Sequence, residues 1–429
     1  MIDIKLIREN PELVKENMKK KFQDEKLPLV DKVKKLDEDW RKLKYEEDGL
    51  RSERNKISEE INKAKKEKKN VSKLLKKAKE IPGKILKMRE KRKKMEGEIL
   101  ELQEKIPNIM SKNVPIGKDD SENVDDRRIG KPRKFDFEVK SHVEIAENLG
   151  MADFESSARV AGTGYYYIEG DLALLNVALT NFARDVMVSK GFRYVETPYM
   201  LKEEIMNQVT DLHDQENMVY KIENDGTFLI GTSEHSLIGR YAGQEVNEKE
   251  LPIKQTSYSM CFRKEIGAHG IDEKGLFRTH QFNKIEMIVI CNPNVKESEK
   301  YYQELQDITV EIFEKMEIPV RVLKICSGDL GDLKYEQIDV EAWSPRRKNY
   351  FEVGSCSNLT AAQAKKLKIS TRIKGERMIP HTLNNTAIAT SRALVAILEN
   401  NQQKDGTIKI PKVLWKYTGF KELKPKKKK

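Results

Sequence analysis

Cysteine is scarce in this chain, and long apolar runs are absent from it. The cysteines are Cys261, Cys291, Cys326 and Cys356, and none belongs to a CxxC pair or has a nearby histidine at metal-ligand spacing. These absences argue against a zinc site and against a disulfide framework. No apolar run approaches the roughly 18 residues that span a bilayer, and the N-terminus lacks the apolar stretch of a signal peptide. We therefore expect a cytoplasmic protein with reduced, mostly buried thiols and no membrane contact.

Phosphate-binding loops are also absent. Neither GxxxxGK[ST] nor GxGxxG occurs in the sequence. A nucleotide enzyme that depends on such a loop is therefore not supported, because the backbone amides of these glycine-rich turns are what hold the phosphates.

Charge is abundant and unevenly placed. The chain has 81 Lys+Arg and 70 Asp+Glu, a net charge of +11. The window from Ile61 to Leu100 holds 16 Lys or Arg and 5 Glu, so it accounts for the whole excess. A basic segment attached to a neutral body suggests an appendage that binds a polyanion. The alternative is a solvated helix face without a partner.

The basic window lies in a heptad pattern. Apolar residues recur in alternating steps of three and four from Val33 to Ala64, and again from Val71 to Ile106, with polar residues near Lys68 to Asn70 between them. This spacing predicts an antiparallel two-helix coiled coil, each limb roughly 50 Å long at ~1.5 Å per residue. Pro82 and Gly83 predict a kink or a break in the second helix.

The sequence divides into four parts. Residues 1–110 form a helical domain with the long arm, and residues 111–134, rich in Pro, Gly, Asn and Asp, read as a linker. Residues 135–420 alternate helices with strands that follow one another without regular crossover helices, which predicts an α+β domain around an antiparallel sheet flanked by helices. Residues 421–429 form a basic tail that we expect to be disordered.

Polar pairs recur at two-residue spacing in the apolar strands of this domain, so the members of each pair share a face. Such pairs are Thr232 with Glu234, Arg263 with Glu265, and Asn384 with Thr386. From Phe277 to Val289, one predicted face carries Arg278, His280, Phe282, Lys284 and Glu286. One pair alone fits a solvated outer face, but together they fit a cradle for a charged ligand.

Five collinear segments resemble class II aminoacyl-tRNA synthetases in the form of the seryl-tRNA synthetases. The resemblance covers nearly the whole chain, including the arm and the phrase IPNI at residues 106–109. The segments are GFRYVETPYML (191–201, motif 1), GTSEH (231–235), CFRKEIGAHGIDEKGLFRTHQFNKIE (261–286, motif 2), NYFEVGSCSN (349–358) and HTLNNTAIATSRALVAILEN (381–400, motif 3).

The resemblance implies an ATP site with magnesium. Arg263, Glu265 and Arg392 would act in catalysis, because this phosphoryl chemistry needs positioning and charge more than proton transfer. The implied ATP-binding residues are Arg263, Lys264, Glu265, Arg278, Phe282, Glu352, Val353, Gly354, Ser355 and Arg392. Glu352 and Ser355 would hold Mg²⁺, which prefers hard oxygens. They are three residues apart, so we expect a β-bulge at Gly354 to bring them to one face.

The resemblance also implies a serine site. Its residues would be Thr232, Ser233, Glu234, Arg263, Glu286, Asn384 and Thr386. For Glu286, the alternative is a buried salt bridge with Lys284 or Arg263.

The implied function is that of a serine–tRNA ligase. It would activate L-serine with ATP and transfer the seryl group to tRNA(Ser), and also to tRNA(Sec). The coiled-coil arm would bind the tRNA, and motif 1 would form a homodimer. Two alternatives remain: a ligase that charges a carrier protein, against which the arm argues, and an inactive RNA-binding paralogue, against which the intact Arg263, Glu286 and Arg392 argue.

Overall fold

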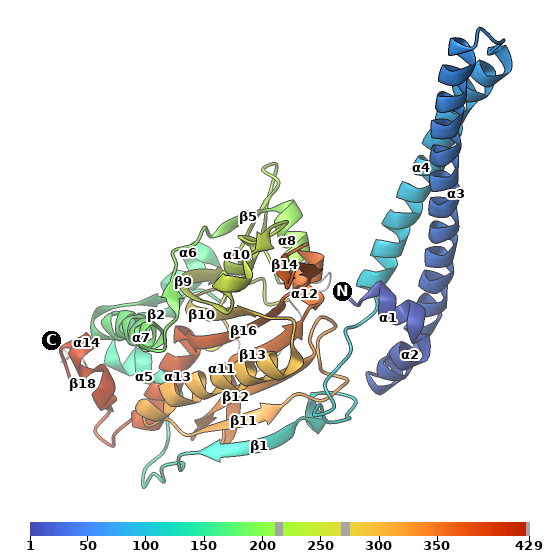
Figure 1. Ribbon diagram of the computed structural model, residues 1–429. Helices are drawn as coiled ribbons and strands as arrows, with labels where there is room; N and C mark the ends of the chain where they lie inside the picture. Colours follow the sequence, from blue (N-terminus) through green and yellow to red (C-terminus); the bar gives the residue numbers. More distant parts are fainter. Residues whose placement is uncertain (211–217, 267–274, 426–429) are drawn as a thin grey trace. The chain divides into compact units, whose positions relative to one another are not determined.

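The computed structural model describes residues 1–210, 218–266 and 275–425 (Figure 1). Residues 267–274 of the motif 2 segment and residues 426–429 of the predicted tail lie outside these ranges. The chain divides into two units, Met1–Ile109 and Met110–Lys429. Within the described ranges, none of the helices combines the length and the apolar character needed to cross a membrane.

The N-terminal unit is a helical hairpin on a small helical base. Its helices are α1 (Ile4–Glu9), α2 (Pro11–Lys20), α3 (Leu27–Lys66) and α4 (Ser72–Glu104). The long helices α3 and α4 form the predicted antiparallel pair, with Ile57 and Ile61 packed against Ile81. α4 continues through Pro82, so no break occurs there. Packing of Ile81 and Ile85 against α3 holds the helix on both sides of the proline.

A buried carboxylate interrupts the apolar seam of this hairpin. Glu47 on α3 is 1% exposed and pairs with Arg51 of the same helix at 2.6 Å and with Arg92 of α4 at 3.3 Å. The Arg92 guanidinium also lies 5.3 Å from the Trp40 ring centroid. A shifted register would leave the Glu47 carboxylate buried and unpaired, so this polar layer fixes which residues of the two helices face each other.

The C-terminal unit is built on an eight-stranded sheet. Its strands, in spatial order, are β1 (Val124–Ile129), β11 (Val320–Lys324), β12 (Glu336–Ser344), β13 (Asn349–Thr360), β16 (His381–Ala389), β10 (Gln281–Cys291), β9 (Ile253–Phe262) and β4 (Arg193–Tyr194). Figure 1 shows this order rising from β1 to β9. All neighbours are antiparallel except β4, which is parallel to β9. The α+β prediction is confirmed.

Helices cover one face of the sheet and enclose the main core. They are α5 (His142–Leu149), α7 (Gly170–Ser189), α11 (Val295–Lys315) and α13 (Thr390–Asn401). Figure 1 shows α11 lying across the strands. Ile285, Met287 and Val289 of β10 point into this core, so Lys284 and Glu286 point to the opposite face. The predicted alternation is confirmed within β10, whereas Arg278 and His280, which were predicted to share its charged face, precede the strand.

A smaller apolar cluster closes one end of the opposite face. Ile288 and Ile290 of β10 pack there with residues of α8 (Glu203–Val209), α10 (Ser233–Gly239) and α12 (Ala362–Lys366). The remaining short elements are α6 (Phe154–Ala161), α14 (Trp415–Thr418), β2 (Ala152–Asp153), β3 (Tyr167–Ile168), β5 (Met200–Lys202), β6 (Lys221–Ile222), β7 (Thr227–Leu229), β8 (Glu245–Val246), β14 (Ser370–Ile373), β15 (Glu376–Met378), β17 (Ile408–Lys409) and β18 (Glu422–Leu423).

Two predicted boundaries need correction. The segment 111–134, predicted to be a linker, contains β1, an edge strand of the main sheet. β1 reads VDDRRI and is mostly exposed, so it lacks the apolar alternation by which a strand is recognised. The predicted tail 421–429 begins inside the fold, because Leu423 is buried and β18 pairs with β17.

Candidate active site

A cavity opens on the polar face of the sheet. Charged side chains from several elements converge on it. Its lining residues are Arg263, Glu265, Phe277, Arg278, Thr279, Phe282, Lys284, Glu352, Val353, Gly354, Thr386, Ala389, Ser391 and Arg392. Most of the ATP-site residues predicted from the sequence are therefore brought together in one place.

Arg263 is held from three sides. Its backbone N–H donates to the His280 carbonyl at 2.9 Å, and its Nε donates to the Gly231 carbonyl at 3.1 Å. Its guanidinium lies 5.3 Å from the Phe282 ring centroid, within cation–π range. These contacts fix the arginine fork in the cavity before any ligand arrives, so little side-chain freedom is left to lose on binding.

Glu265 reaches the cavity through a turn, not a strand. β9 ends at Phe262, and Glu265 has a left-handed backbone with φ of 51°. Its carboxylate accepts a hydrogen bond from Arg278 Nη1 at 3.3 Å. The expectation that Arg263 and Glu265 share a strand face is therefore wrong, although both line the same cavity.

Arg392 and Glu352 form an ion pair at the cavity wall. Arg392 lies in the first turn of α13, and its Nη1 donates to Glu352 Oε2 at 3.0 Å and to the Glu352 carbonyl at 2.8 Å. Burial alone would raise the pKa of Glu352, but the positive charges of Arg392 and Arg263 and the hydrogen bond from Arg392 outweigh it and lower that pKa.

The predicted bulge between Glu352 and Ser355 is present. Val340 of β12 pairs with Gly354 and the next residue pairs with Glu352, so Val353 is the extra residue. The Val353 side chain is buried in the main core. Without this extra residue, Glu352 and Ser355 would point to opposite faces of the sheet.

Asp339 of β12 joins these two residues, although the sequence did not predict it as part of the site. Burial and the nearby Glu352 carboxylate raise the pKa of Asp339, while hydrogen bonds from Gln337 and Ser355 act in the opposite direction. Gln337 Nε2 donates to Asp339 Oδ1 at 2.8 Å and to Ser355 Oγ at 2.9 Å. The bulge therefore gathers two carboxylates and a hydroxyl beside the cavity.

A second polar cluster adjoins the cavity through Lys284 and Thr386. Glu286 is 2% exposed, and its Oε2 accepts from Thr232 Oγ1 at 3.2 Å and from Thr386 Oγ1 at 3.3 Å. Lys284 Nζ lies 2.5 Å from the same oxygen. The salt bridge considered as an alternative for Glu286 is therefore present, and it coexists with the two predicted hydroxyl neighbours.

Glu234 lies next to this cluster on α10. Its Oε1 accepts from Asn384 Nδ2 at 2.9 Å and from Gln363 Nε2 at 2.8 Å. Burial, reinforced by the Glu286 carboxylate, raises the pKa of Glu234 to about 7. Thr232 caps α10, so Thr232 and Glu234 belong to a helix start and not to the predicted strand. The cap still places both side chains beside Glu286.

Two predicted site residues, Ser233 and Lys264, do not line the cavity. The Ser233 hydroxyl is fully buried and donates to the Ser257 carbonyl at 3.2 Å. Lys264 follows Arg263, but it does not line the cavity. In contrast, Gln363 on α12 was not predicted to belong to the site, but its side-chain amide donates to Glu234. This hydrogen bond could not be predicted from the sequence, because Gln363 and Glu234 are far apart along the chain and only the fold brings them together.

Family models and whole-chain relatives match this sequence. Residues 1–110 match the seryl-tRNA synthetase N-terminal domain, and residues 219–401 match the tRNA synthetase class II core domain (G, H, P, S and T). A serine–tRNA ligase from Methanospirillum hungatei is 44% identical over 426 residues, covering 99% of this chain and 100% of the relative. The chain belongs to the seryl-tRNA synthetase family. The resemblance stated from the motifs is confirmed.

Solved members of the seryl-tRNA synthetase family share the whole fold. The seryl-tRNA synthetase from Pyrococcus horikoshii, solved in complex with ATP, has a TM-score of 0.94 and 42% identity, with 100% of both chains covered. The cytoplasmic serine–tRNA ligase from Naegleria fowleri, solved with AMP, has a TM-score of 0.89 and 34% identity over 99% of each chain. Both the hairpin and the sheet unit thus fall within the family's architecture.

Proposed function

We propose that this chain activates L-serine with ATP, giving seryl-adenylate and pyrophosphate, and then transfers the seryl group to tRNA(Ser) and tRNA(Sec). The proposal depends on one observation: two polar sites of different character adjoin each other, since Lys284 and Thr386 belong to both. An arginine-lined cavity suits a polyphosphate, and the adjoining cluster of Glu234, Glu286 and Thr386 suits a small ligand with an ammonium and a hydroxyl. Membership of the seryl-tRNA synthetase family supports the same reading.

Activation is an in-line displacement at phosphorus. The serine carboxylate attacks the α-phosphorus of ATP, a carboxyl–phosphorus bond forms, and the bond to pyrophosphate breaks. Arg263 would hold both the attacking carboxylate and the α-phosphate, since it lines the cavity and its Nε is bonded to the carbonyl of Gly231, the residue before Thr232 of the carboxylate cluster. Its fixed charge compensates the negative charge on the transferring group without reorganisation. Arg278 and Arg392 would hold the outer phosphates, and Phe282 would stack on adenine with Glu265 at its amino group.

Selectivity for serine would come from the buried hydroxyl partners. Glu234 and Glu286 together attract the ammonium, and Thr386 or the second oxygen of Glu286 meets the substrate hydroxyl. Alanine in this closed site would leave these polar groups unpaired. An unpaired buried group costs about 1–3 kcal/mol, which is a large fraction of the discrimination that such a pocket can reach.

Mg²⁺ fits the group formed by Asp339, Glu352 and Ser355. These residues offer two carboxylates and a hydroxyl, and burial together with the nearby Glu352 carboxylate raises the pKa of Asp339, so a cation there would stabilise its ionised form. In the described ranges no cluster of three or more His, Cys, Asp or Glu could hold a metal, so phosphate and water oxygens would complete the shell, as is usual for Mg²⁺. When bound, the ion neutralises charge on the phosphates.

Removing the Asp339 carboxylate tests this assignment. Asp339→Asn should raise the Mg²⁺ concentration for half-maximal ATP/pyrophosphate exchange by roughly tenfold. The reason is that one of the two carboxylates proposed to lie near the ion is replaced by a neutral amide. The maximal rate at saturating Mg²⁺ should fall less. Exchange is measured across a magnesium titration. Asp307→Asn on α11 serves as the control, since Asp307 pairs with Arg127 outside the cavity. An unchanged magnesium requirement in Asp339→Asn would rule the residue out.

The raised pKa of Glu234 predicts a pH-dependent affinity for serine. Above pH 7 the carboxylate is ionised and attracts the substrate ammonium; as pH falls through about 7 it takes up a proton and the attraction is lost. The serine KM should therefore rise about tenfold for each pH unit below 7, at saturating ATP and Mg²⁺. Steady-state exchange from pH 5.5 to 8.5 measures this. Glu234→Gln should have a high serine KM that hardly changes with pH, and a sloping profile in that variant would assign the titration elsewhere.

The N-terminal hairpin is proposed to bind the tRNA, and the basic window on its outer part carries this reading. The lysines between Lys63 and Lys94 are exposed, so they are available to phosphates.

The described cysteines are all unpaired thiols. Reduced thiols and a tRNA substrate are consistent with the cytoplasm as the working compartment.

We also propose a homodimer through motif 1, and an apolar stripe on α7, the helix that precedes the motif 1 segment, supports it. Leu174, Val177 and Val188 are 52%, 53% and 51% exposed, and their spacing places them on one helix face. Leu174→Glu combined with Val177→Glu should convert a dimer to a monomer, because a twofold interface meets each change twice. Sedimentation at micromolar concentration decides this. Leu86→Glu, at an exposed leucine of α4, controls for added surface charge.

The amino-acid specificity of exchange tests the proposed function as a whole. ATP/pyrophosphate exchange is measured with serine, threonine, alanine and glycine in turn, with Mg²⁺ and without tRNA. Only serine should support rapid exchange. Exchange with another amino acid would favour the carrier-protein ligase, and a folded protein that binds ATP without exchange would favour the inactive paralogue.

A further inference from the structure

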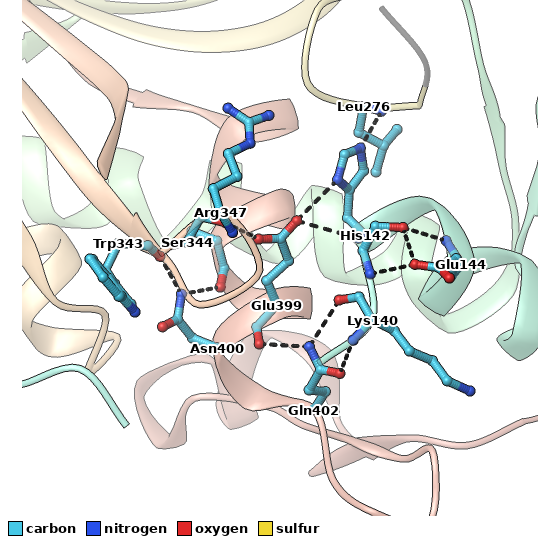
Figure 2. A network of polar contacts seen from close by, with 12 residues as sticks. Lys140, His142, Glu144, Leu276, Trp343, Ser344, Arg347, Glu399, Asn400 and Gln402 are labelled. Carbon is cyan, nitrogen blue, oxygen red and sulfur yellow. Dashed lines mark hydrogen bonds and ion pairs between the residues drawn. The ribbon is translucent and has the colours of Figure 1, made fainter. Parts of the chain in front are cut away.

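A buried histidine lies behind the ATP cavity, on the covered side of the sheet. His142 is the first residue of α5, whose start is fixed by a capping box between Ser141 and Glu144. Gln402 accepts from the Lys140 N–H at 2.9 Å and donates to the Lys140 carbonyl at 3.1 Å, which ties this helix start to the end of α13 (Figure 2). The His142 side chain is 4% exposed, so its ring has one defined environment.

The contacts of His142 determine its tautomer. The Leu276 backbone N–H can only donate, and it lies 3.3 Å from Nε2, so Nε2 accepts. Nδ1 then carries the proton of the neutral ring and donates to Glu399 Oε1 at 3.3 Å. Figure 2 shows the ring between Leu276 and Glu399. His142 therefore links a carboxylate of α13 to the backbone of the segment that leads into β10.

Glu399 connects His142 to the end of β12 and the loop that follows it. Its side chain is 1% exposed and also accepts from the His142 N–H and from the Ser344 hydroxyl. The Ser344 hydroxyl in turn accepts from the Arg347 N–H at 3.1 Å. Three donors on one buried carboxylate satisfy it without a cation.

This series of contacts returns to Phe277, the residue after Leu276, through Arg347. The Arg347 guanidinium lies 3.9 Å from the Phe277 ring centroid, and the Arg392 guanidinium lies 5.3 Å from it on the cavity side. Phe277 and its neighbour Arg278 both line the cavity. The path from Leu276 through His142, Glu399, Ser344 and Arg347 back to Phe277 is thus a closed ring of contacts, and it holds Leu276 and Phe277, the two residues that precede Arg278 in the cavity wall.

We propose that His142 and Glu399 are positioning residues for the ATP site: they hold the 275–278 segment so that Phe277 and Arg278 present their side chains to the nucleotide. This inference rests on the proposed function for the identity of the ligand. A small displacement of Arg278 lengthens its contacts to phosphate, so the effect falls on ATP and spares serine, whose cluster lies on Glu234 and Glu286.

Two substitutions of His142 separate its two bonds. In His142→Gln the longer side chain can offer its amide oxygen to the Leu276 N–H, as Nε2 does. In His142→Asn the shorter amide can donate to Glu399 but does not reach Leu276. Both variants remove the ring and keep a polar amide. The ATP KM in serine-dependent exchange and the Kd for ATP by calorimetry should rise roughly tenfold in His142→Asn and less than threefold in His142→Gln, with the serine KM unchanged in both.

A substitution at Gly275 tests the hydrogen bond between the Leu276 N–H and His142 by changing the donor segment instead of the histidine. A Cβ at Gly275 would lie 2.6 Å from His142 Nε2, and its φ is +85°. Gly275→Ala keeps the histidine itself, but its Cβ would also lie 2.5 Å from Val143 Cγ2 of α5, so the 275–276 backbone must move away from the start of α5 and the bond from the Leu276 N–H to His142 is lost. It should raise the ATP KM as His142→Asn does, and the double variant should be no worse than either single one, because both remove the same hydrogen bond.

The control is His381→Asn on β16. His381 is 8% exposed and its Nδ1 lies 3.1 Å from Ser298 Oγ, away from the cavity. It should lower the melting temperature and leave the ATP KM unchanged. The inference is overturned if His142→Asn and Gly275→Ala behave like this control, or if their effects on the ATP Kd add independently. Absence of exchange in the wild type would contradict the proposed function, and the ATP Kd would still decide the inference.

Discussion

Arg263→Ala should reduce serine-dependent ATP/pyrophosphate exchange by about 10³-fold, the largest loss expected from any single change in the cavity. Arg263 is the residue that we propose to hold both the serine carboxylate and the α-phosphate in the arginine-lined cavity. It is fixed by the Gly231 carbonyl and by Phe282, so its charge is already in place when the carboxylate attacks. Losing it removes a preorganised charge and also a bidentate clamp.

A lysine at this position separates these two contributions. Arg263→Lys keeps the charge without the planar fork, so exchange should recover only in part. Arg321→Ala is the control, because Arg321 on β11 also makes a partly buried ion pair, with Glu341, but lies outside the cavity. It should leave exchange near the wild-type rate. Full activity of Arg263→Ala, in a protein that melts as the wild type does, would remove Arg263 from the mechanism.

The architecture could be predicted where periodicity is strong. The heptads of α3 and α4 and the alternation in β10 both follow from how apolar residues meet a partner surface. β1 was missed because an edge strand with exposed residues does not need apolar alternation. The continuity of α4 through Pro82 likewise depends on packing against α3, which overrides the local tendency of proline to end a helix.

The site was predictable to the extent that its residues lie in collinear motifs. Arg263, Glu286, Glu352 and Arg392 were found in this way, and the cavity brings Arg263, Glu352 and Arg392 together. The strand rule failed for Thr232 and Glu234, because a helix cap at Thr232 turns the chain before Glu234. Spacing alone does not distinguish a strand from a capped helix over three residues.

Asp339 and Gln363 were missed for a different reason. Each supports a predicted residue from a neighbouring element: Asp339 on β12 pairs with Ser355 beside the bulge of β13, and Gln363 lies on α12 beside Glu234. Neither belongs to a local pattern that signals a ligand. Asp339 alternates with the core-facing Ile338 and Val340, so the sequence places it on the polar face of the sheet, but only strand pairing shows what it faces there.

Neutralising the exposed lysines of the arm should separate the two half-reactions. Lys65→Ala with Lys66→Ala, and Lys76→Ala with Lys77→Ala, remove charge from the ends of α3 and α4 that meet at the hairpin turn. Alanine preserves the helices. The combined variant should lower kcat/KM for tRNA in aminoacylation on the order of 10²-fold, and the slope of log affinity against log salt should fall by about one for each phosphate that is no longer bound. ATP/pyrophosphate exchange, which needs no tRNA, should stay unchanged.

The control removes the same kind of charge from the sheet unit. Lys296 and Lys300 are exposed on α11, which covers the face of the sheet opposite the cavity. Their replacement by alanine should leave both reactions as they are. Loss of salt dependence only in the arm variants would identify α3 and α4 as the phosphate-binding surface. Unchanged aminoacylation across all variants would instead favour the solvated helix face, because a basic surface without a polyanion partner contributes nothing to either half-reaction.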